Sequence, residues 1–134
     1  MRNLFRLTLG LALAGSVIPP AFAQQGYVII ERGMSSETRK ESAVGISRID
    51  GKSLRDPRRS DPLPPGRHVV TVHFESARGV FEPPTQDVEV DLPPCTLAKV
   101  VAEYEARTGG RWKPKVYTEP LGECVAKMRK ATGK

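Results

Sequence analysis

The chain has 134 residues, of which 39% are hydrophobic and 27% charged, and its 21 Lys and Arg against 15 Asp and Glu give a formal net charge of +6. This length fits one domain, the hydrophobic content is too high for a fully disordered chain, and the charge falls short of a dedicated nucleic-acid binder. We therefore expect one folded domain with no nucleic-acid partner.

The first 23 residues have the three-part layout of a secretory signal peptide. Met1–Arg6 carries two arginines and no acidic residue, and the apolar run Leu7–Ile18 follows it. After a proline pair, the small residues Ala21 and Ala23 predict cleavage before Gln24. An uncleaved membrane anchor is the alternative, but the apolar run is shorter than the about 20 residues that cross a bilayer. We expect an exported protein, periplasmic or secreted, with no transmembrane span after cleavage.

The first half of the domain, which we place at residues 24–124, alternates between hydrophobic and polar residues as strands do. The Asp50-Gly51 pair predicts a tight hairpin turn, because both central residues of such a turn need a positive φ. Four prolines exclude regular structure from Arg55–Gly66, which we expect to be a surface loop. The predicted strands are Gln25–Glu31, Ala43–Ile49, Lys52–Leu54 and Arg67–Glu75, the last with Val70, Val72 and Phe74 on its core face.

The second half continues the pattern with strands at Gln86–Leu92 and Trp112–Glu119, the latter at a sheet edge because it contains Pro114. The connection at residues 76–85 is rich in turn signals, with Val80 and Phe81 expected to pack inward. Cys95–Ala106 fits either a strand or a helix, and residues 125–134 form a basic C-terminal tail of one or two helical turns. Six or seven short strands predict an all-β fold, a single small β-sandwich or open barrel.

Cys95 and Cys124 are the only cysteines, and in an exported protein they predict one disulfide bond. Free thiols or a metal pair are the alternatives. Zinc needs four ligands, and the only histidines, His68 and His73, are five residues apart in a predicted strand and therefore point to opposite faces. We expect a structural disulfide, no metal and no cofactor.

Two stretches of the chain resemble known small exported proteins. Arg48–Gly51 (RIDG) followed by Leu63–Val72 (LPPGRHVVTV) resembles a PEGA-type module, a small β domain of cell-envelope and surface proteins. The last third, with Cys95, a strand, the Trp112-Lys113-Pro114 segment and Cys124, resembles small exported bacterial proteins of undefined function. The resemblance implies a β fold in the envelope and supplies no catalytic residues.

The residues that could carry chemistry do not form a recognisable catalytic motif. No serine lies in a G-x-S-x-G or S-x-x-K pattern. His68 and His73 could each act as a base, but a lone histidine in a strand is more typical of a packed or surface residue. We therefore expect no enzymatic activity.

Four arginines around the proline-rich loop are the candidate partner surface: Arg55, Arg58, Arg59 and Arg67. They could face an envelope protein or an anionic envelope component. The alternative is a loop that is merely soluble, because Asp56 and Asp61 interrupt the basic residues.

These observations favour an exported, non-catalytic β-sandwich protein with a binding or assembly role in the cell envelope. The alternative is a small periplasmic inhibitor or effector that binds a protein target through the loop at residues 55–66. A small envelope enzyme using His68 or His73 with a carboxylate is a third hypothesis.

Overall fold

A computed structural model describes residues 26–75 and 79–131 of the chain. The predicted signal peptide and its cleavage site lie outside these residues. The described part contains eight strands and one helix, which confirms the all-β class. These elements are β1 (Val28–Arg32), β2 (Glu41–Ile49), β3 (Lys52–Ser53), β4 (Gly66–Phe74), β5 (Val80–Glu82), β6 (Thr85–Leu92), β7 (Thr96–Tyr104), β8 (Gly109–Pro120) and α2 (Gly122–Ala131).

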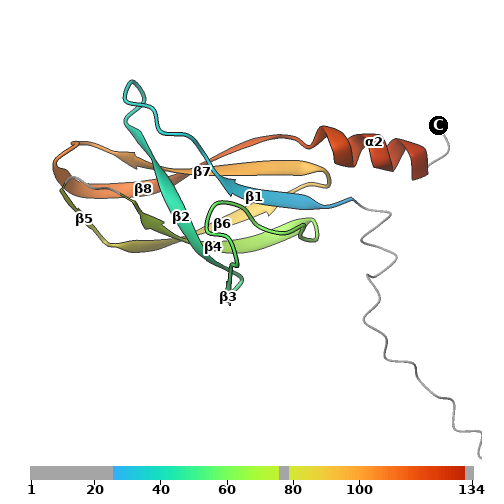
Figure 1. Cartoon of the computed structure of the whole chain (residues 1–134), viewed down its shortest axis with the longest axis horizontal. Helices are drawn as coiled ribbons and strands as arrows, with labels where there is room; N and C mark the ends of the chain where they lie inside the picture. The colour runs from blue at the N-terminus through green and yellow to red at the C-terminus, as the bar shows by residue number, and fades with distance from the viewer. Residues whose placement is uncertain (1–25, 76–78, 132–134) are drawn as a thin grey trace, which may run out of the picture.

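Six strands form one sheet in the order β5-β8-β7-β2-β4-β6, with β1 added beside β7 and β3 beside β2 (Figure 1). The sheet curls until β6 approaches β8. There, the side chain of Gln86 donates to the Trp112 carbonyl at 2.7 Å, and the Trp112 indole donates to the Pro83 carbonyl at 2.6 Å. Of the two predicted architectures, the structure is therefore the barrel, nearly closed and built from a single sheet.

The alternating pattern of β4 places its core residues as predicted. Val70 and Val72 are fully buried, and Phe74 stacks on Phe81 with ring centroids 3.9 Å apart. The prediction that Val80 and Phe81 both pack inward is confirmed for Phe81 and wrong for Val80. Phe81 packs into the core on the short strand β5, whereas Val80 is 74% exposed. Fully buried aliphatic residues from the four strands β1, β2, β4 and β7 fill the barrel: Val28, Ile30, Val44, Ile46, Val70, Val72, Ala98, Val100 and Ala102.

The ambiguous segment after Cys95 is the strand β7, because it lies at the centre of the sheet. It pairs with β8 along one edge and with β1 and then β2 along the other. Val101 breaks the expected alternation because the outer face of β7 is also covered at this point. A Cβ atom added to Gly33 would lie 2.5 Å from Val101 Cγ1, so the backbone of Gly33 packs directly over that side chain.

Two local predictions follow from backbone chemistry and are confirmed. Asp50 and Gly51 have φ of +53° and +79°, and they join β2 to β3 in a tight turn. Pro114 lies opposite Ala102 of β7, and β8 pairs with β5 only at Gly109–Arg111. Within residues 26–75 and 79–131, no strand therefore pairs with Pro114 on its other side, which is where a residue without an N–H group is tolerated.

The predicted disulfide between Cys95 and Cys124 is present. It joins the residue before β7 to helix α2, which lies at one end of the barrel (Figure 1). The helix begins at Gly122 and has 10 residues, so it is longer than the one or two turns expected of a tail starting at Val125. Within the described residues, no helix has the length and apolar character needed to cross a membrane.

Candidate functional site

The proline-rich loop, residues 55–66, is irregular as predicted, but its backbone is held along its length. Val28 and Leu63 exchange two backbone hydrogen bonds of 2.9 Å each, and Ser60 N–H donates to the Ile30 carbonyl at 2.8 Å. On the other side, Ile46 N–H donates to the Pro57 carbonyl at 2.8 Å. The loop therefore occupies the free edge of β1 and bridges to β2.

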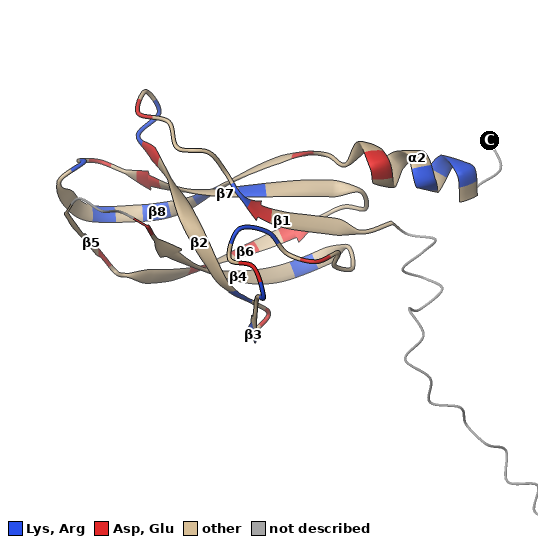
Figure 2. Cartoon of the chain, viewed as in Figure 1, with Lys and Arg blue, Asp and Glu red and all other residues tan. Residues whose placement is uncertain are grey.

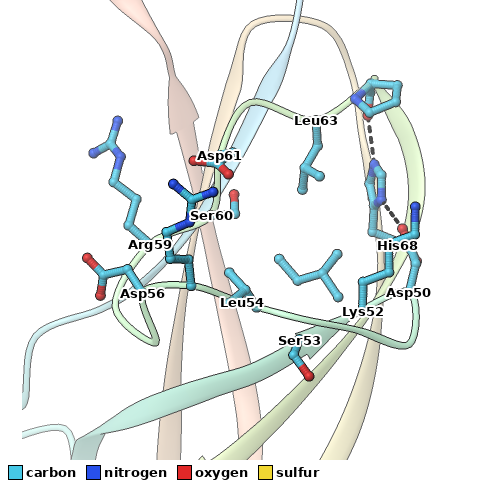
Figure 3. Close-up of a pocket in the computed structure, with 13 residues that line it drawn as sticks. Asp50, Lys52, Ser53, Leu54, Asp56, Arg59, Ser60, Asp61, Leu63 and His68 are labelled. Atoms are coloured by element: carbon cyan, nitrogen blue, oxygen red, sulfur yellow. Dashed lines mark hydrogen bonds and ion pairs between the residues drawn. The ribbon is translucent and has the colours of Figure 1, made fainter. Parts of the chain in front are cut away.

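One side of this loop bounds a hollow of about 500 Å³, here named the loop pocket (Figure 3). The opposite wall is the Asp50-Gly51 turn with β3. Ile49, Leu54 and Leu63 give it an apolar floor, and all three also pack against the barrel core. Figure 3 shows Leu63 pointing into the space between the loop and the turn. Charged side chains from both walls surround this floor: Asp50, Lys52, Arg55, Asp56, Arg59 and Asp61.

His68 ties the two walls of the loop pocket together. Its Nδ1 lies 2.6 Å from Asp50 Oδ2, and its Nε2 lies 2.7 Å from the Pro64 carbonyl (Figure 3). The residue is only 6% exposed. A backbone hydrogen bond from Val69 and the contact with His68 hold the pKa of Asp50 below its usual value, although partial burial opposes this shift. Both ring nitrogens face oxygen acceptors of the protein, so His68 holds the turn and the loop together.

His73 lies on the opposite face of β4, as the spacing of the two histidines predicts. Its ring covers Gly45 of β2, where an added Cβ atom would lie 2.1 Å from His73 Cε1. His73 Nε2 is 3.4 Å from Glu75 Oε1 on the same surface. The two histidines therefore contribute to separate places, and only His68 borders the loop pocket.

The four candidate arginines do not gather into one basic patch. Arg55 and Arg59 line the loop pocket, and Arg59 pairs with Glu31 at 2.9 Å. Arg58 pairs with Asp56 at 3.1 Å, and Arg67 pairs with Glu89 at 3.5 Å on the outer face of the sheet. Basic and acidic residues accordingly alternate along this region in Figure 2. Among the described residues, Arg55 alone of the four has no carboxylate partner.

The sequence did not predict that Lys52, Leu54, Asp61 and Leu63 would join this site. Of these four residues, only Leu54 and Leu63 could have been predicted to face the pocket, because they are large apolar residues at the two sides of a polar, proline-rich segment. Lys52 lies on β3 and Asp61 lies within the loop, and only the folding of the loop back onto β1 brings the two residues to one pocket.

A second hollow, the outer groove, has a volume of about 630 Å³ and lies over β7 between the end of β1 and β8. The exposed Met34 borders it. Its charged residues are already engaged in ion pairs within the described chain, which leaves it little charge to offer a ligand. The pairs are Glu31 with Arg59, Arg32 with Glu75, Lys99 with Glu119, and Arg39 with Glu41.

Glu41, in the outer groove, is expected to make the fold sensitive to acid. Burial alone would raise the pKa of its carboxyl group, but hydrogen bonds from Tyr117 and Arg39 and the charges of Arg39 and Lys115 outweigh burial and lower it. A carboxylate with a lowered folded-state pKa stabilises the fold above its unfolded pKa, about 4.3. This stabilisation is lost as the pH falls through the folded-state pKa.

The variant Glu41→Gln cannot titrate at this position. We expect it to be about 1–3 kcal/mol less stable than the wild type at neutral pH, because the charge-assisted hydrogen bonds are lost. Urea unfolding from neutral pH down to about pH 3 should show this difference shrinking. Glu89→Gln, at a side chain that is 61% exposed, is the control and should change stability by less than about 0.5 kcal/mol. A Glu41→Gln difference that does not vary with pH would contradict the prediction.

A scan of protein-family models and searches among curated proteins and solved structures found no match to this chain. The resemblance to PEGA-type modules therefore stays a prediction.

Proposed function

We propose that this is an exported, non-catalytic β-barrel protein that binds a partner in the cell envelope through the loop pocket. The signal-peptide layout of residues 1–23 supports export, and the Cys95–Cys124 disulfide fits an oxidising compartment such as a periplasm. An envelope protein or an anionic envelope component is the proposed partner class.

The observation that carries the proposal is that both ring nitrogens of His68 contact oxygen atoms of the protein itself. A general base must present a ring nitrogen to a substrate, within hydrogen-bond reach of the proton that it removes. In His68 both nitrogens are occupied, by Asp50 and by the Pro64 carbonyl, and the residue holds the pocket walls together. A pocket built in this way is suited to recognition, because its shape is fixed before a ligand arrives.

The second candidate function is an inhibitor or effector that inserts the loop at residues 55–66 into a protein target. It is favoured by the hydrogen bonds that fix the loop backbone on β1 and β2, since a preorganised loop loses little entropy on binding. In that case the outer side of the loop, with Arg58, would make the contacts instead of the pocket.

Capture from an envelope extract would test these two functions. We expect tagged mature protein to enrich a partner that is lost when Leu54→Trp fills the pocket and retained when Arg58→Ala alters the outer side of the loop. Arg67→Ala, on the outer face of the sheet, is the matched control. The opposite pattern would support the inhibitor hypothesis. Equal capture by all four proteins would contradict binding through either side of the loop.

Export is expected to leave a mature chain that begins at Gln24. The small residues Ala21 and Ala23 follow an apolar run and a proline pair, which is the pattern that signal peptidases cleave. Intact-mass measurement of the protein recovered from the envelope fraction would show loss of residues 1–23. Recovery of a membrane-bound chain that still begins at Met1 would contradict it.

A further inference from the structure

We infer that Gly26 and Tyr27 form a cap over the Cys95–Cys124 disulfide, and that local opening of this cap admits external thiols to the bond. The inference concerns the redox chemistry of the bond and goes beyond the proposed binding function.

Contacts between the cap and both sulfur atoms carry the inference. A Cβ atom added to Gly26 would lie 2.8 Å from Cys95 Sγ and 3.0 Å from Cys124 Sγ, so this glycine packs directly on the bond. The backbone of Tyr27 continues the cover. Its N–H group faces Cys124 Sγ at 3.4 Å, and its carbonyl accepts a hydrogen bond from Cys95 N–H at 2.9 Å. The Tyr27 ring extends the cap towards α2, where its centroid is 6.0 Å from Lys127 Nζ.

The capped disulfide is closed to an attacking thiol. Cys124 is only 1% exposed and Cys95 only 8%. Reduction begins when a thiolate attacks one sulfur, forms a mixed disulfide with it and releases the other cysteine as a thiolate. The second thiolate of a dithiol reductant then displaces the remaining cysteine, so two electrons pass from the dithiol to the protein and the reductant leaves as a disulfide. The first step requires direct contact with a sulfur atom, and the cap prevents that contact.

The cap is the most weakly held of the segments that cover the bond. It precedes β1, which begins at Val28, whereas Cys95 leads into β7, a strand paired on both sides. Helix α2 is fixed at Cys124 by the bond itself. Cleavage before Gln24 would leave only two residues ahead of Gly26, and segments next to a chain terminus open at the lowest free-energy cost. We therefore expect the cap to open without unfolding of the barrel.

The first test measures how fast dithiothreitol reduces the oxidised mature protein at increasing urea, with the freed thiols alkylated and counted by mass spectrometry. At low urea, we expect reduction to be slower than that of oxidised glutathione by about a hundredfold or more. It should also depend only weakly on urea, because a local opening exposes little surface. A low-urea rate close to that of oxidised glutathione would overturn the inference. So would a rate that follows global unfolding at every urea concentration.

Two glycine variants test the position of the cap. Gly26→Ala places a Cβ atom against both sulfur atoms, and we expect it to raise the low-urea reduction rate by about tenfold or more. Gly51→Ala is the matched control, because Gly51 has nearly the same φ, +79° against +76°, but an added Cβ atom there meets nothing within 4 Å. This control introduces the same backbone strain in the turn between β2 and β3, so its low-urea rate should stay within about twofold of the wild type. If Gly26→Ala does not fold, the urea dependence of the wild type decides.

A helix variant tests whether α2 admits the thiol instead. Ala126→Gly weakens the helix at an exposed position and leaves the cap unchanged. We expect its low-urea reduction rate to stay within about twofold of the wild type. An acceleration by Ala126→Gly as large as that by Gly26→Ala would overturn the inference, as would equal rates for Gly26→Ala and Gly51→Ala.

Discussion

Replacing Trp112 with alanine is expected to destabilise the fold by about 3–5 kcal/mol, the range for removing a large aromatic side chain from a core. Trp112 is only 5% exposed, and its ring lies 5.5 Å from that of Phe74. Its indole N–H also donates to the Pro83 carbonyl at the point where the barrel nearly closes. The variant therefore loses packing and one of the bonds that connect β8 to the segment before β6.

Urea unfolding followed by far-UV circular dichroism would measure this effect, because the variant removes the chain's only tryptophan and with it that source of fluorescence. Trp112→Phe is the matched control. It keeps an aromatic ring but loses the N–H donor, so we expect a cost of about 1–2 kcal/mol. A cost below about 1 kcal/mol for the alanine variant would show that this ring does not close the core.

Removing both cysteines is expected to destabilise the protein by about 3.6 kcal/mol, the chain-entropy value for a loop of this length. The disulfide closes a segment of 29 residues between Cys95 and Cys124. The backbone of Cys95 also connects the chain before β1 to the chain before α2. Cys95 N–H donates to the Tyr27 carbonyl at 2.9 Å, and Leu121 N–H donates to the Cys95 carbonyl at 2.8 Å.

Loss of the bond should release α2 first. The helix has 10 residues, which is below the length at which an isolated helix is stable in water, and Cys124 is its only buried residue. We expect faster tryptic cleavage near Lys127 in Cys95→Ala/Cys124→Ala, measured by mass spectrometry, together with a lower urea midpoint. Reduced wild-type protein is the control, because it lacks the bond but keeps the sequence. An unchanged midpoint in both would show that the bond does not stabilise the fold.

Backbone chemistry explains the features of the fold that could be predicted locally. The alternation in β4 and β6, the Asp50-Gly51 turn and the edge position of Pro114 each depend on a few adjacent residues. The disulfide was predictable because a chain with two cysteines and a signal-peptide layout has only one intramolecular pairing. The secondary structure of Cys95–Ala106 was ambiguous because it depends on residues that are distant in the sequence. The alternation of this segment fails at Val101, whose side chain is covered by Gly33.

The loop pocket shows most clearly the difference between features that depend on adjacent residues and features that depend on distant ones. That residues 55–66 form an irregular loop could be predicted from their composition, because four proline rings remove backbone donors and fix φ. Which loop residues face inward depends on contacts with distant strands. Leu63 pairs with Val28 of β1, and His68 meets Asp50 across 18 residues of chain. The four arginines look like one cluster in the sequence, but folding pairs Arg58, Arg59 and Arg67 with carboxylates and leaves Arg55 at the pocket. Charge balance over such distances depends on the partners that the fold supplies, and no local pattern of residues contains that information.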